Sequence, residues 1–174
     1  GSDPHAAVYW LAKMLEAGED PRFLARRLII LASEDIGNAD PRGLSIAVAA
    51  MEAVDFVGMP EARIILAQAT TYLATAPKSN AAYKAIDAAT ADIENGRVLP
   101  VPEHLKNVHV EAVDKEAPAA YQYPHDHANH FVQQTYVPTS ARYYIPTHEG
   151  YEETIARRMQ WWEEQARKAT GGNP

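Results

Sequence analysis

Apolar side chains recur every three or four positions through the first half of the chain, the spacing that one face of an α-helix requires. Glycine or proline interrupts this pattern at short, regular intervals. The pattern therefore predicts five helices, over residues 4–17, 21–36, 41–57, 60–76 and 80–95.

Three of these helices are predicted to begin at an Asp-Pro pair, namely Asp3-Pro4, Asp20-Pro21 and Asp40-Pro41. An aspartate side chain accepts hydrogen bonds from the free amides of a first helical turn. Proline suits that turn because it has no N–H to leave unpaired. Ser79 is expected to cap the fifth helix.

The predicted loops are only a few residues long, so consecutive helices should pack as antiparallel neighbours. We therefore expect an all-α fold in which residues 3–96 form a five-helix bundle. The positions expected to face its core are Ala7, Leu11, Met14, Leu15, Phe23, Leu24, Leu28, Ile30, Leu31, Ile36, Ile46, Val48, Ala49, Ala50, Val54, Val57, Ile64, Ile65, Leu66, Ala69, Tyr72, Leu73, Tyr83, Ile86, Ala89 and Ile93.

The pattern changes after Gly96, where prolines interrupt every long helix. Residues 97–148 are expected to form an irregular segment, rich in proline and tyrosine, that packs on the bundle. A short hairpin of residues 133–137 and 142–145 is an alternative for part of it. Residues 149–170 should form a C-terminal helix and 171–174 a frayed tail. Residues 1–2 look like the remnant of a removed tag, which predicts a piece of a longer protein.

The 174 residues are enough for one domain with a sizeable core. A net charge of −7 disfavours binding to DNA unless a basic patch is present. The absence of cysteine excludes disulfides and thiolate metal sites. The longest apolar run, residues 28–32, falls far short of the roughly 20 residues of a membrane helix, so no membrane partner is expected.

Catalytic motifs are absent from the sequence. It contains no phosphate-binding G-x-x-x-x-G-K-[ST] loop, no dinucleotide fingerprint and no G-x-S-x-G elbow. We therefore predict no catalytic residues and no bound cofactor in this chain.

His125, Asp126, His127 and His130 are the one cluster that suggests a metal site. Imidazole and carboxylate groups are ligands of Zn²⁺, but adjacent side chains converge on one ion only if the loop bends to suit. The spacing matches no established motif. A polar loop, with Asp126 capping a turn, is the interpretation that we favour.

Arg22, Arg26 and Arg27 lie on one predicted helix. They are candidates for docking DNA or an acidic peptide, since guanidinium groups pair with phosphates and carboxylates. The alternative is an ordinary solvated face paired with nearby carboxylates.

Trp161 and Trp162 are our candidates for an interface. Adjacent residues of a helix point about 100° apart, so the two indoles cannot face one core. One should contact either the tyrosine-rich segment or another subunit, unless that segment covers both.

Six stretches of the sequence are distinctive when taken together. They are DPHAAVYWLA (3–12), LEAGEDPRF (15–23), ASEDIGNADP (32–41), VGMPEA (57–62), LATAPKSN (73–80) and YPHD (123–126). In this order they resemble one known family, the carboxy-terminal region of replication-associated recombination protein A, related to the Werner helicase-interacting protein. Between residues 107 and 121 the resemblance is weaker, because the family has a glycine- and lysine-rich stretch there.

The resemblance implies a helical collar like that of clamp-loader ATPases, which joins the subunits of a homotetramer. ATP and Mg²⁺ would bind in an AAA+ module upstream of Gly1. The whole protein would act at replication forks and in recombination, with DNA and single-stranded DNA-binding protein as partners. Its expected location is the cytoplasm, associated with the nucleoid.

Overall fold

The computed structural model describes residues 1–106 and 121–169. Within these residues it contains six α-helices and no strand, which confirms the all-α prediction. The predicted tail at 171–174 and most of the divergent stretch at 107–121 lie outside the described residues. The helices are α1 (Pro4–Glu16), α2 (Pro21–Leu31), α3 (Arg42–Val57), α4 (Ala62–Thr75), α5 (Ala81–Glu94) and α6 (Glu152–Ala169).

Two of the three predicted aspartate caps, Asp3 and Asp20, are the N-caps of their helices. The third helix, α3, begins at Arg42 rather than at Pro41 and has no side-chain cap at its N-cap residue, although Asp40 accepts the amide of Arg42 at 3.2 Å. The Asp3 carboxylate accepts hydrogen bonds from the amides of His5 and Ala6, at 2.9 and 3.0 Å. Asp20 accepts from the amide of Arg22 in the same way, at 2.9 Å. These bonds pair first-turn amides that would otherwise have no partner, so the polar pattern that predicted the helix boundaries also stabilises them.

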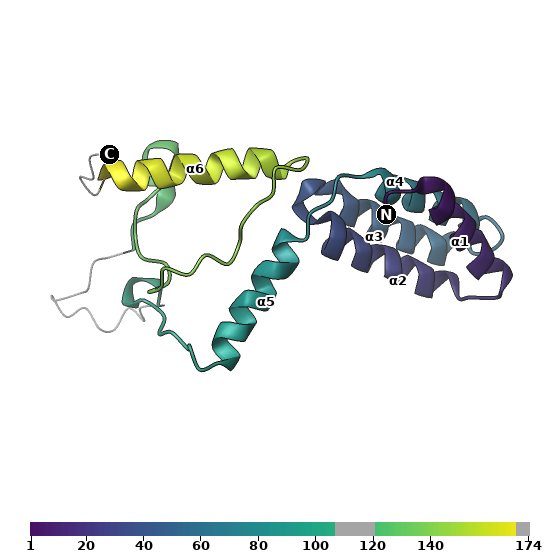
Figure 1. Cartoon of the computed structure of the whole chain (residues 1–174), viewed down its shortest axis with the longest axis horizontal. Helices are drawn as coiled ribbons and strands as arrows, with labels where there is room; N and C mark the ends of the chain where they lie inside the picture. The colour runs from purple at the N-terminus through teal and green to yellow at the C-terminus, as the bar shows by residue number, and fades with distance from the viewer. Residues whose placement is uncertain (107–120, 170–174) are drawn as a thin grey trace. The chain divides into compact units, whose positions relative to one another are not determined.

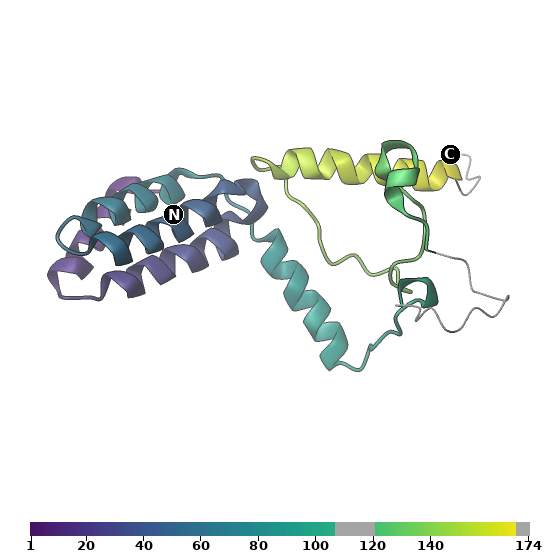
Figure 2. The same ribbon diagram turned by 180° about the vertical axis from the view of Figure 1, so that it is seen from behind.

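The chain divides into two compact units. The first comprises residues 1–88 and 143–157, and the second residues 89–142 and 158–174. In the first unit, helices α1 to α4 lie side by side (Figure 1), and the view from behind shows the same arrangement (Figure 2). Helix α4 packs against α1, α2 and α3, so it is the central element of this unit.

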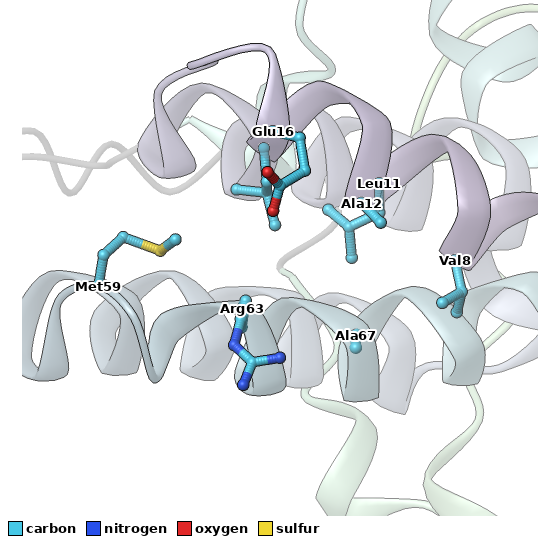
Figure 3. Close-up of a pocket in the computed structure, with 8 residues that line it drawn as sticks. Val8, Leu11, Ala12, Glu16, Met59, Arg63 and Ala67 are labelled. Atoms are coloured by element: carbon cyan, nitrogen blue, oxygen red, sulfur yellow. The ribbon is translucent and has the colours of Figure 1, made fainter.

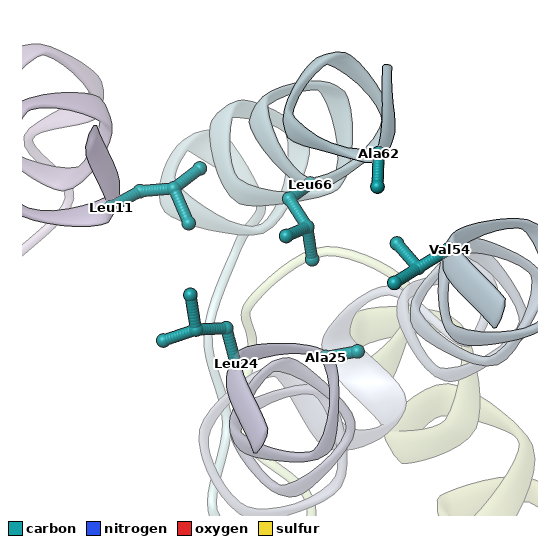
Figure 4. Close-up of a cluster of buried hydrophobic side chains, with 6 residues drawn as sticks. All are labelled: Leu11, Leu24, Ala25, Val54, Ala62 and Leu66. Atoms are coloured by element: carbon teal, nitrogen blue, oxygen red, sulfur yellow. The ribbon is translucent and has the colours of Figure 1, made fainter. Parts of the chain in front are cut away.

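Leu66 of α4 lies at the centre of the larger core cluster (Figure 4). It is fully buried, and Leu11 and Leu24 reach it from α1 and α2. The small side chains of Ala25 and Ala62 let the helices approach closely, and the larger ones fill the remaining space without voids. The cluster consists of Leu11, Leu24, Ala25, Val54, Ala62 and Leu66.

The second core cluster forms where α2 ends. Helix α2 continues as a π-helical turn, Ala32–Ile36, before Gly37 stops it. Ile36 is fully buried against Leu73 of α4. Gly43 of α3 faces both, and a side chain there would meet Ile36 at 3.2 Å. A side chain at this position would therefore require Ile36 to shift by a few tenths of an ångström.

The second unit has little regular structure between its helical parts. Its described residues form short 3-10 turns at Glu103–Leu105, Pro124–Asp126 and Ala128–His130. The alternative of a hairpin at 133–137 and 142–145 is wrong, because neither stretch forms a strand. The predicted boundaries of the irregular segment stay a prediction.

Several apolar positions expected in the core are exposed instead. In α1 to α4 the apolar spacing extends beyond the part of each helix that its neighbours cover. Helix α5 is not among the helices that pack closely against one another, so its apolar residues are exposed for a different reason. The expectation of a core position is wrong, within this single chain, for Met14, Phe23, Ile30, Ala49, Val57, Ile64, Tyr83, Ile86 and Ile93.

We expect Leu66→Ala to lower the free energy of unfolding by about 2–5 kcal/mol, because it opens a cavity at the centre of the core. Ile64→Ala is the matched control, since Ile64 lies on the same helix and is exposed. It should change the free energy by no more than about 0.5 kcal/mol. Urea titration at one protein concentration measures both, and equal losses would contradict the packing described.

Candidate assembly surfaces

Helix α5 carries a stripe of exposed apolar side chains, formed by Tyr83, Ile86 and Ile93. Their exposed fractions are 45%, 63% and 59%. The three lie within about 80° of one another around the helix, because each residue advances the helix by about 100°. We call this set the α5 stripe. Exposed apolar side chains that share one face of a helix are typical of sites that contact another protein.

Apolar hollows flank helix α1 on two sides. The first lies between α1 and α4 and has a volume of about 230 Å³ (Figure 3). Val8, Leu11 and Ala67 provide its apolar wall. Glu16 of α1 and Arg63 of α4 line the same hollow, so it contains one charge of each sign.

The second hollow, the α1–α2 groove, has a volume of about 310 Å³. Met14 and Phe23 border it and are 39% and 40% exposed. Its only charged lining residue is Arg27. An apolar groove with half-exposed side chains at its edge has the form of a site for an amphipathic helix. It is lined by Ala7, Leu11, Met14, Phe23, Leu24, Arg27, Leu28 and Thr70.

A pair of exposed aromatic rings lies on the outer surface of α1. Tyr9 and Trp10 meet edge to face with ring centroids 5.3 Å apart. The Lys13 ammonium lies 5.0 Å from the Trp10 ring centroid, a cation–π contact. Exposed tyrosine and tryptophan are enriched in protein interfaces, so this surface is a further candidate for contact.

The buried carboxylate of Glu152 lies where α5 and α6 begin. Ser79 donates its hydroxyl to Glu152 Oε2 at 2.7 Å and accepts the amide of Ala81 at 3.2 Å. The amide and hydroxyl of Thr147 donate to the same oxygen at 2.6 and 2.7 Å. Tyr144 donates its hydroxyl to Oε1 at 2.9 Å. Ser79 therefore caps α5, as predicted, and also holds the first turn of α6 on the first unit.

The pKa of Glu152 results from two opposing effects. Burial raises it, since the side chain is fully inaccessible to water. The hydrogen bonds from Ser79, Thr147 and Tyr144 lower it, and together they outweigh burial, so the pKa lies below its ordinary value. The carboxylate is thus kept ionised by neutral donors rather than by a cation.

The sequence analysis did not find this network. Glu152 is one of two adjacent glutamates in a charged helix, and nothing in the local pattern separates it from Glu153. Only the return of residues 143–157 to the first unit distinguishes them. The backbone amide of Tyr151 also donates to the carbonyl of Ala39, at 2.8 Å, and Gly150 passes beside that carbonyl with a positive φ of 54°.

The three candidate arginines of α2 do not form one patch. Arg22 pairs with Asp55 of α3 at 2.6 Å. Arg26 is exposed, and Arg27 lines the α1–α2 groove. Neither Arg26 nor Arg27 forms an ion pair with any residue that the structure describes.

Two of the candidate metal ligands, His125 and His130, lie ring beside ring with their planes tilted by 50°. The rings of His125 and His130 are 4.7 Å apart, and Tyr123 lies 5.1 Å from His125. Asp126 is in the 3-10 turn Pro124–Asp126, which His127 ends. Among the described residues no group of three or more histidine or acidic side chains is placed to hold a metal ion.

Phe131 of the irregular segment contacts both candidate tryptophans. Its ring lies edge-on to Trp161 at 6.1 Å and parallel to Trp162 at 6.4 Å. Trp162 remains 39% exposed, and Trp161 is half-buried. Phe131 thus covers part of each indole, and whether a second subunit contacts the rest stays a prediction.

Residues 1–163 match the model of a protein family described as "MgsA AAA+ ATPase C terminal". The chain belongs to this family. The four-helix core and the surfaces described above are therefore those of an MgsA C-terminal domain.

Relatives of known name support this membership. The chain is 51% identical over 163 residues to an uncharacterised AAA domain-containing protein of Mycobacterium tuberculosis, covering 91% of this chain and 36% of the relative. It is 43% identical over 170 residues to replication-associated recombination protein A of Escherichia coli, covering 95% and 38%. It is 41% identical over 140 residues to ATPase WRNIP1 of Dictyostelium discoideum, covering 79% and 16%.

The chain thus spans little more than a third of the length of its two bacterial relatives. What it shares with them is the MgsA C-terminal region of AAA+ ATPases. In the part of this domain that the structure describes, no helix is both long enough and apolar enough to cross a membrane.

We expect Glu152→Gln to lower the free energy of unfolding at neutral pH by about 1–3 kcal/mol, because the variant loses the charge that its buried donors stabilise. Glu149→Gln, an exposed change in the same segment, is the control.

The pH dependence of this loss follows from the lowered pKa. The folded state binds the proton less readily than the unfolded state. The difference between the wild type and Glu152→Gln should therefore be constant above the ordinary value of 4.5 and shrink as pH falls through the lowered pKa. Urea titrations from neutral to acidic pH measure it. A difference that grows on acidification would contradict this assignment.

Proposed function

We propose that this chain is the self-association domain of a replication-associated AAA+ ATPase, a collar that sets how many ATPase modules act together. The chain itself carries no catalysis in this proposal. Its family membership supports a place beside an AAA+ module. That module would bind ATP and Mg²⁺ upstream of Gly1.

The α5 stripe is the observation that carries this proposal. Exposed apolar side chains cost free energy in water, about 25 cal/mol for each Å² of apolar surface left uncovered. Ile86 and Ile93 are both more than half exposed, although their helical spacing is that of a buried face. A helix that is amphipathic but uncovered in one chain is expected to bury its apolar face against another chain.

The remaining parts of the proposal rest on the resemblance to replication-associated recombination protein A. We propose a homotetramer, in the cytoplasm and associated with the nucleoid. DNA and single-stranded DNA-binding protein would be partners of the full-length protein. The Escherichia coli protein of that name is about 2.6 times as long as the region that matches this chain, because the match covers 38% of it. The remaining length is enough for a separate ATPase module.

We expect the chain in solution to have a mass several times that of one 19.2 kDa chain, with four chains as the proposed state. Ile86→Asp should reduce it, because a carboxylate on the α5 stripe cannot be buried without a partner. Sedimentation equilibrium over a range of concentrations measures the mass.

Ala88→Asp is the matched control, since Ala88 is exposed on the opposite side of the same helix. It should leave the mass unchanged. A wild-type mass of one chain at the highest concentration would contradict the proposed function.

A second candidate function is a docking module for DNA or for the acidic tail of single-stranded DNA-binding protein. The guanidinium groups of Arg26 and Arg27 favour it, because they are exposed and form no ion pair with residues 1–106 or 121–169, which leaves them available to an anion. Arg22 contributes less, since Asp55 already neutralises it.

If this function holds, Arg26→Glu should abolish binding of single-stranded DNA or of an acidic peptide. The wild-type affinity should fall steeply as salt is raised, as expected when phosphates or carboxylates pair with arginine. Arg22→Glu should have a smaller effect. Fluorescence anisotropy with labelled ligands tests this, and binding that Arg26→Glu leaves unchanged removes the idea.

A further inference from the structure

Two apolar surfaces of the first unit are left uncovered by the residues that the structure describes. One is the part of the α5 stripe formed by Tyr83 and Ile86, and the other is the α1–α2 groove. They do not cover each other, because Ile86 and Phe23 both remain exposed. One surface is a protruding apolar helix face, and the other is an apolar hollow of about 310 Å³. Their shapes are those of the two halves of a helix-in-groove contact.

The charges of the two surfaces are opposite. Helix α2, with sequence PRFLARRLIIL, has three arginines and no acidic residue. Helix α5, with sequence AAYKAIDAATADIE, has one lysine against two aspartates and one glutamate, a net charge of −2. Asp87 above all, and also Glu34, raises the pKa of the Tyr83 hydroxyl, so negative charge surrounds the stripe. The groove presents Arg27 to such a helix.

The other hollow beside α1 does not offer this complementarity. Glu16 and Arg63 both line it, so their charges compensate (Figure 3). A helix with a net negative charge would be attracted by Arg63 and repelled by Glu16, and the two electrostatic energies would be similar in size. The α1–α2 groove contains Arg27 alone among charged residues. Charge therefore selects this groove over its neighbour.

We infer that α5 of one copy docks in the α1–α2 groove of a second copy, with Ile86 between Met14 and Phe23 and Asp87 facing Arg27. This inference rests on the proposed self-association and names the two surfaces that meet. The apolar stripe would supply the area buried, and the ion pair would select the orientation of the helix.

The contact joins two different surfaces, so it is heterologous. Each copy then offers one helix and one groove, and copies add head to tail until the rotation closes a ring. A contact of this kind predicts a definite behaviour for mixtures of variants. One copy can lack a usable stripe and another a usable groove. These two copies can still form one contact, in which the intact stripe of the second lies in the intact groove of the first.

The test uses Ile86→Asp, which removes the stripe, and Arg27→Glu, which reverses the charge of the groove. Both positions are exposed, so circular dichroism should show unchanged helix content. Each variant alone should lose the multi-chain mass. An equimolar mixture should give a mass of two chains and nothing larger, measured by sedimentation. Arg27→Glu combined with Asp87→Arg should restore the wild-type mass.

Arg22→Glu is the matched control, because Arg22 lies on the same helix but pairs with Asp55 away from the groove. It should keep the wild-type mass, and a loss as large as that of Arg27→Glu would overturn the inference. A wild type that assembles while Arg27→Glu also keeps its full mass would overturn it and leave the proposed function standing. A mixture that stays at one chain would also overturn it, because one intact stripe and one intact groove would then fail to hold two copies together. A wild-type mass of one chain would remove the inference together with the proposed function.

Discussion

The hydrogen bond between Ser79 and the buried carboxylate of Glu152 links three parts of the chain. Ser79 follows α4 and caps α5, while Glu152 opens α6. A carboxylate taken out of water is tolerated only when donors surround it, and Thr147 and Tyr144 supply the others. The network therefore holds the returning segment on the first unit only while all of its donors stay in place. Partial satisfaction of such a network would be costlier than its absence.

The four-helix core shows why apolar surface remains outside. Helix α4 is surrounded by α1, α2 and α3, and small residues at its contacts bring these helices close. Each of the outer helices is covered only on the side that faces its neighbours. Residues at the edges of the apolar faces, such as Met14 and Phe23, are left half-exposed around a groove. Four helices thus bury the centre of the bundle but leave apolar surface at its rim.

The apolar surface left exposed by the core gives the proposed assembly its physical basis. A net charge of −7 makes identical chains repel one another, so a self-contact needs local attraction to overcome it. The arginine-rich α2 and the acidic α5 provide opposite charges on separate surfaces of one chain. Repulsion elsewhere on the chain would then disfavour contacts in other registers. Specificity and association would come from the same uneven distribution of charge.

Local chemistry in the sequence was enough to predict the helices. The Asp3, Asp20 and Ser79 caps are recognisable because a cap acts on amides two or three residues away. The family was recognisable from six short stretches, because a resemblance between sequences can be seen without a structure. Which apolar positions are buried was not recognisable, because helical spacing marks a face but not what covers it. Only the tertiary structure decided that Leu66 is central while Ile86 is exposed, and that Glu152 rather than Glu153 is buried, because burial depends on neighbours far away in the sequence.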